Sequence, residues 1–90
     1  MRAIIVYEMI PESTKMFLFD CKEAGDRSML LRLHGNIWNS VDADDEAHEW
    51  FQKKIDEKGA TEIFNSDKRT GILDLKELQA DCIIHTGFFL

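Results

Sequence analysis

The chain carries few side chains that could bind a transition metal or act as a nucleophile with its base. Its imidazoles are His34, His48 and His85, and its thiols are Cys21 and Cys82. Zinc sites use closely spaced Cys and His pairs, but the sequence has no C-x-x-C pair and no second His within a helical turn. It also lacks a G-x-S-x-G elbow and a glycine-rich phosphate loop. We therefore expect no metal, no cofactor and no catalytic residue, and we interpret both cysteines as buried, reduced thiols.

Carboxylates and other oxygen ligands could instead hold calcium. A calcium loop that starts at Asp42 would place Lys53 at the last ligand position, where a carboxylate is required. The frame 66–77 has glycine and glutamate at the correct positions, but Ser66 and Lys68 stand at the first and third ligand positions. An ammonium group repels the ion, so we expect no calcium binding.

Carboxylates are concentrated at the beginning of the strongest predicted helix. The members of this cluster are Asp42, Asp44, Asp45 and Glu49. Acids in a first turn complement the helix dipole, and Ser40 or Asp42 could cap the helix, so the cluster is explained without any function. The alternative is a face that binds a protein partner by charge complementarity. Asp44 and His48 are four residues apart, and we interpret them as a solvated pair.

The negative charge is confined to one part of the chain. Residues 36–62 hold eight acids and three bases, while the net charge of the whole chain is −6. This balance disfavours direct contact with nucleic acid or with an anionic membrane. It is compatible with a basic protein partner, including a nucleic-acid-binding protein whose groove normally holds phosphates.

Three aromatic residues could anchor such a partner. Trp38 lies in a predicted connector, and Phe88 and Phe89 are adjacent in a predicted strand. Neighbouring side chains of a strand point to opposite faces, so one of the two phenylalanines requires a second layer, a partner or a self-contact. The last option gives an alternative function, in which the C-terminal strand completes a homodimer.

Hydrophobic periodicity predicts the elements that position these residues. Strands are expected at 2–10, 15–21, 61–65 and 82–90. The first two form a hairpin, and apolar residues on both faces of the first strand indicate a central position. The main amphipathic helix is expected at 42–58, ended by Gly59. Residues 28–34 fit a short helix and almost as well a strand, and 72–78 fit a brief strand with one helical turn. The pattern indicates an α+β two-layer sandwich, an antiparallel-rich sheet packed by one main helix.

Length and composition restrict the chain to one small domain. Ninety residues with 44% hydrophobic and 31% charged side chains are typical of a soluble globular domain, and we assign residues 1–90 to it. A domain of this size has little volume for a substrate pocket of the usual ~300–1,000 Å³. The apolar run at residues 3–7 is too short for a signal-peptide core or a membrane span, so we expect a cytoplasmic protein.

These observations predict a small acidic protein-binding module without catalytic activity. Its most concrete form is an inhibitor or regulator that occupies a surface of its partner. The predicted binding residues are Asp42, Asp44, Asp45, Glu49, Trp38, Phe88 and Phe89. A small metal-dependent or hydrolytic enzyme is the least favoured alternative.

Overall fold

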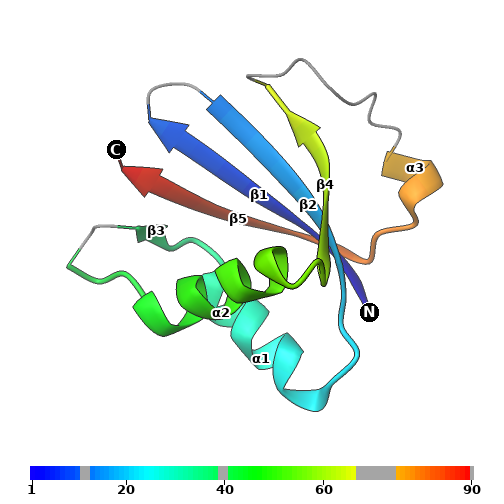
Figure 1. Ribbon diagram of the computed structural model, residues 1–90, viewed down its shortest axis with the longest axis horizontal. Helices are drawn as coiled ribbons and strands as arrows, with labels where there is room; N and C mark the ends of the chain where they lie inside the picture. The colour runs from blue at the N-terminus through cyan, green and yellow to red at the C-terminus, as the bar shows by residue number, and fades with distance from the viewer. Residues whose placement is uncertain (11–12, 39–40, 67–74, 90) are drawn as a thin grey trace.

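The computed structural model describes the chain except for residues 11–12, 39–40, 67–74 and 90 (Figure 1). The strands are β1 (Arg2–Ile10), β2 (Ser13–Asp20), β3 (Ile37–Trp38), β4 (Ala60–Asn65) and β5 (Cys82–Phe89). The helices are α1 (Ala24–Leu33), α2 (Asp45–Asp56) and the short α3 (Leu75–Leu78). The four predicted strands are confirmed to within two residues at each end. Part of the predicted strand near residue 72 lies outside the described residues.

The strands form one mixed sheet in the order β3-β5-β1-β2-β4. The hairpin of β1 and β2 is antiparallel, as expected, and β4 is antiparallel to β2. The expectation of an antiparallel-rich sheet holds for this half alone, because β5 runs parallel to β1 and β3 runs parallel to β5. The central position of β1 is confirmed, and its residues 3–7 are buried whichever face they point to.

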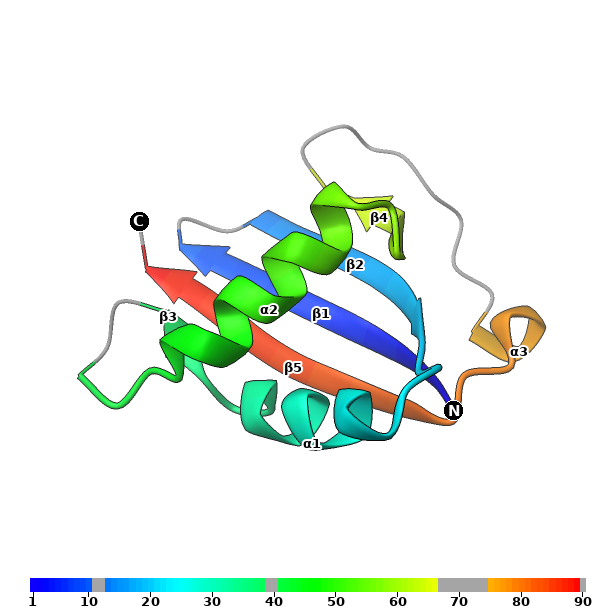
Figure 2. The same cartoon turned by 60° about the horizontal axis from the view of Figure 1, so that its bottom comes forward.

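Two helices cover one face of the sheet, where one main helix was expected. In Figure 2, α2 crosses the strands diagonally and α1 lies beside it on the same face. The α+β sandwich is thus confirmed, with a larger helical layer. Helix α1 begins four residues before the predicted segment because Asp26 and Glu23 form a capping box. The buried Asp26 carboxylate accepts the backbone N–H groups of Lys22 and Glu23, both at 3.2 Å.

The core lies between the helices and the sheet, and Phe51 of α2 is at its centre. Phe51 is 0% exposed, and its ring centroid lies 5.8–5.9 Å from those of Tyr7, Phe17 and Phe19. Edge-to-face and stacked pairs at this spacing add to the stabilisation from apolar burial. The cluster joins α2 to the hairpin, and the fold is compact, with a radius of gyration of 12.6 Å.

Helix α2 is shorter than predicted at both ends. It was expected at 42–58 with Ser40 or Asp42 as the cap, but the N-cap is Asp44, whose Oδ1 accepts the Ala47 N–H at 3.1 Å. Ser40 lies outside the described residues. At the other end, Lys58 adopts a left-handed conformation with φ 59°, and the Gly59 N–H donates to the Lys54 carbonyl at 2.8 Å. The helix therefore ends before the glycine that was expected to stop it.

Candidate functional site

The exposed side of α2 carries carboxylates that differ in their surroundings. Asp45 and Glu49 stand one turn apart and are both exposed. Among the residues that the structure describes, no cation forms an ion pair with either of them. Asp42, before the helix, is also exposed. These three carboxylates are available to a partner.

Asp44 belongs to the same predicted cluster but already contacts other parts of the chain. Arg32 of α1 donates to both of its carboxylate oxygens, from Nε at 2.6 Å and from a terminal guanidinium nitrogen at 2.8 Å. Glu46 accepts from the same guanidinium at 3.3 Å. The Arg32 contact, with help from the Ala47 N–H, lowers the pKa of Asp44 below its usual value. Asp44 therefore caps α2 and joins it to α1, and a further role in partner binding stays a prediction.

Asn36 holds the beginning of α2 beside the C-terminal half of β5. Its backbone carbonyl accepts the Gly87 N–H and the Thr86 hydroxyl, both at 2.9 Å. Its side-chain oxygen accepts the Asp44 N–H at 3.3 Å. The exposed carboxylates of α2 and the end of the sheet are consequently fixed relative to each other.

The predicted aromatic anchors occupy that end of the sheet. Trp38 of β3 pairs with Phe88 of β5, and Phe89 is the last residue of the same strand. The side chains of all three lie outside the described residues, so their role as anchors stays a prediction. At its end β5 has strand neighbours on both sides, β3 and β1. A homodimer formed by edge-to-edge pairing there would have to displace β3.

Among the described residues, the histidines and cysteines do not gather into one metal site. His48 of α2 is fully buried, so the interpretation of Asp44 and His48 as a solvated pair is wrong. Burial lowers the pKa of His48, although the nearby Asp45 and Asp44 oppose the shift. His85 is exposed, and its ring lies 3.4 Å from the Glu8 carboxylate.

Both thiols are free and half-buried at the border of the core, which is less burial than expected. Burial, with the Asp26 charge as a smaller cause, raises the pKa of Cys21, so the thiolate nucleophile is disfavoured there. Within the described residues, no three Cys, His, Asp or Glu side chains gather as metal ligands. The calcium frame at 66–77 falls largely outside those residues.

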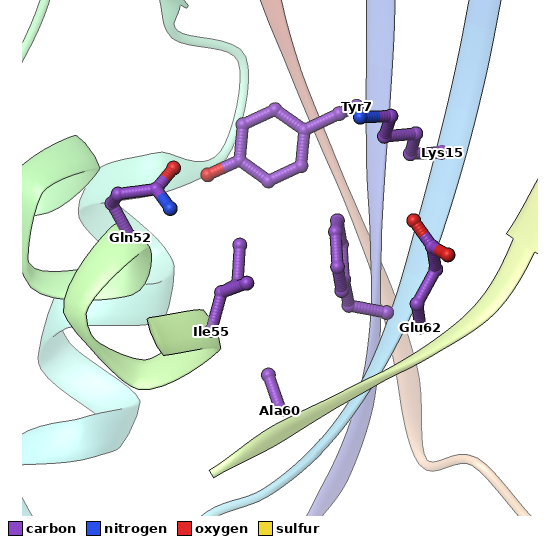
Figure 3. A pocket seen from close by; sticks show the side chains of 7 residues that line it. Tyr7, Lys15, Gln52, Ile55, Ala60 and Glu62 are labelled. Atoms are coloured by element: carbon purple, nitrogen blue, oxygen red, sulfur yellow. The ribbon is translucent and has the colours of Figure 1, made fainter. Parts of the chain in front are cut away.

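A pocket of about 380 Å³, which no sequence pattern indicated, lies between α2 and the hairpin side of the sheet. This volume lies within the usual range for ligand pockets, contrary to the expectation from chain length. The floor is apolar and consists of Phe17, Ile55 and Ala60. Figure 3 labels Ile55 and Ala60 among them. No local motif could have indicated it, because its walls come from four elements brought together by the sheet order.

Four polar side chains line the same pocket. They are Tyr7 of β1, Lys15 of β2, Gln52 of α2 and Glu62 of β4. In Figure 3 the Tyr7 hydroxyl points toward Gln52, while Lys15 and Glu62 stand on the opposite, strand side. Burial raises the pKa of Tyr7, so its hydroxyl remains neutral. The pocket thus combines one positive, one negative and two neutral groups above an apolar floor.

No protein-family model, curated protein or solved structure matches the chain. Among the described residues, no helix is both long and apolar enough to cross a membrane. Function must therefore be inferred from the chemistry of the described surface and of the pocket.

Proposed function

We propose that this protein is a small non-catalytic binding module that regulates a basic protein partner through the exposed side of α2. The observation that carries the proposal is the contrast within one helix. Asp45 and Glu49 are exposed and have no ion pair among the described residues, whereas Asp44 and Glu46 are held by Arg32. Unpaired carboxylates on a rigid helix accelerate encounter with a basic surface and give binding that weakens as salt is added.

The apolar part of the proposed interface is the end of the sheet next to α2. The contacts of Asn36 support this choice, because they join β5 to the N-terminal end of α2. An interface with aromatic anchors beside a charged rim follows the usual composition of binding surfaces. Trp38, Phe88 and Phe89 would serve as these anchors. A nucleic-acid-binding protein is the basic partner we favour, since carboxylates in a row can occupy a groove that holds phosphates.

The chemistry of the nucleophilic side chains supports a non-catalytic role. Nucleophilic catalysis requires a nucleophile in hydrogen-bond contact with a base. Among the described residues, neither Cys21 nor Cys82 makes such a contact with a histidine. Two free thiols also fit a reducing compartment, and the cytoplasm is therefore the location we propose.

Charge reversal on α2 tests the proposal. The double variant Asp45→Lys/Glu49→Lys should lose a partner that the unchanged protein captures from native-host lysate at low salt. The matched control is Glu57→Lys/Glu77→Lys, which makes the same change in net charge at other exposed positions. It should retain the partner. We expect one stoichiometric basic protein, identified by its mass and released at high salt.

Two results would contradict this function. The first is a partner that binds the Asp45→Lys/Glu49→Lys variant as tightly as it binds the unchanged protein. It would show that these carboxylates form a solvated helix surface and do not bind the partner. Capture of further copies of the chain alone, confirmed by a dimer mass in sedimentation, would favour the homodimer instead.

A further inference from the structure

The pocket between α2 and the sheet has opposite charges on neighbouring strands. Lys15 of β2 is half-buried, and Glu62 of β4 is exposed. Side chains of opposite charge on paired strands commonly contact each other. Here Lys15 pairs with Asn65 and Glu62 pairs with Phe17, so the two charges stand diagonally rather than directly opposite each other, and among the described residues neither forms an ion pair. The Glu62 Oε1 accepts a hydrogen bond from the Asn65 side-chain amide at 3.3 Å, which leaves the carboxylate charge unneutralised, so a ligand can still form an ion pair with Glu62 and with Lys15.

The opposite wall offers neutral hydrogen-bonding groups. The Gln52 amide nitrogen donates to Asp56 at 3.1 Å, so its carbonyl oxygen is left as an acceptor. The Tyr7 hydroxyl lies on the same side, as Figure 3 shows. Between the two walls, Phe17 and Ala60 are each 7% exposed and Ile55 is half-buried. A ligand that reaches both walls must therefore place an apolar body across this floor.

Volume and charge restrict the ligand further. About 380 Å³ is close to the lower limit of known ligand pockets, which favours a small ligand. A polyanion is disfavoured, because Glu62 would repel it and Lys15 is the single cation among the described residues that line the pocket. A molecule with one carboxylate and one ammonium group satisfies both side chains at once, and both contacts would be charge-assisted.

We propose that this pocket binds a small zwitterion with an apolar body, the chemistry of a free apolar amino acid. Its carboxylate contacts the Lys15 ammonium, its ammonium contacts Glu62, and its side chain lies on Phe17. The site is distinct from the acidic surface of α2, since its described lining includes neither Asp45 nor Glu49.

Amide NMR of isotope-labelled protein tests this with three related probes. Phenylalanine carries both charges, phenylpropanoate carries only the carboxylate, and phenethylamine carries only the ammonium group. For a ligand of this size in a partly open pocket we expect a Kd on the order of 1 mM for phenylalanine. Each single-charge probe should bind about fivefold or more weakly, because one charged contact is missing.

Substitutions assign the two charged contacts. Lys15→Met keeps the apolar stem, and Glu62→Gln keeps the shape; each should weaken phenylalanine binding about fivefold to tenfold. In addition, Lys15→Met should affect phenylpropanoate but not phenethylamine, and Glu62→Gln should do the reverse. Lys22→Met and Glu49→Gln change exposed residues outside the lining and should stay within about twofold of the unchanged protein.

Three results would overturn the assignment. The first is that phenylalanine shifts no amide of the pocket lining. The second is that a single-charge probe binds as tightly as phenylalanine. The third is that Lys15→Met and Glu62→Gln bind like the two controls while their spectra show a folded protein.

Discussion

The two sides of α2 differ in composition and in role. On the inner side, Ala47, His48 and Phe51 are fully buried and join the helix to the sheet. On the outer side, Asp45 and Glu49 are exposed and contact no cation among the described residues. The inner side therefore determines stability, and the outer side can change its charge without unfolding the domain. This difference makes the outer side suitable for partner binding.

The strongest test of this difference is to shorten Phe51. Phe51→Ala removes the ring that contacts Tyr7, Phe17 and Phe19, and it leaves a cavity that the surrounding rings cannot fill. We expect a loss of about 3–5 kcal/mol in the free energy of unfolding. That is a large fraction of the stability of a domain of this size. Urea denaturation followed by circular dichroism would measure it.

Glu49→Gln on the outer side is the matched control. It should change the free energy of unfolding by less than about 0.5 kcal/mol, as is usual for exposed positions. Equal losses for Phe51→Ala and Glu49→Gln would show that the two sides of α2 do not differ as proposed.

Most of the fold could be predicted from periodicity, because long patterns are dominated by burial. Strand β1 is apolar on both faces, and this pattern correctly predicted its central position in the sheet. The first turn of α1 could not be predicted, since residues 22–27 are polar and the helix start depends on Asp26 accepting two backbone N–H groups. The parallel direction of β5 relative to β1 could not be predicted either, because their pairing is set by the path of the whole chain rather than by either strand.

The candidate site was harder to predict, because it depends on contacts between distant residues. The acids of α2 are visible in the sequence, but the Arg32 that holds Asp44 lies on another helix. Lys15 and Glu62 face one pocket only because β2 and β4 are paired. The burial of His48, by contrast, could have been predicted from the helical period, because His48 lies three residues before Phe51 on the inner side of α2.

Substitution of Asp44 should destabilise the fold less than Phe51→Ala does and more than Glu49→Gln does. Asp44→Ala removes the cap of Ala47 and both contacts of Arg32, so the melting temperature should fall by several degrees. Asp45→Ala, one position later, should have little effect. In a double-mutant cycle, Arg32→Gln should cost less in the Asp44→Ala background than in the unchanged protein. Additive losses would show that the Arg32 contact contributes nothing beyond the cap.

The buried His48 should make the free energy of unfolding depend on pH, with a smaller effect than the substitutions above. Burial lowers its pKa below the ordinary 6.5, so the unfolded chain takes up a proton more readily than the folded one. The His48 contribution is therefore fully present above pH 6.5 and is lost as the pH falls through the lower folded pKa. Between about pH 7 and about pH 5, the free energy of unfolding should decrease, and His48→Gln should flatten this dependence.

Two carboxylates with lowered pKa values affect stability at a lower pH than His48 does. The pKa values of Asp20 and Asp44 are lowered, chiefly by hydrogen bonds from Arg2 and Arg32, so their contributions are lost only as the pH falls below the ordinary 3.8. A slope that survives unchanged in His48→Gln would assign the titration to another group. The buried side of α2 would then not contain the group that responds to pH.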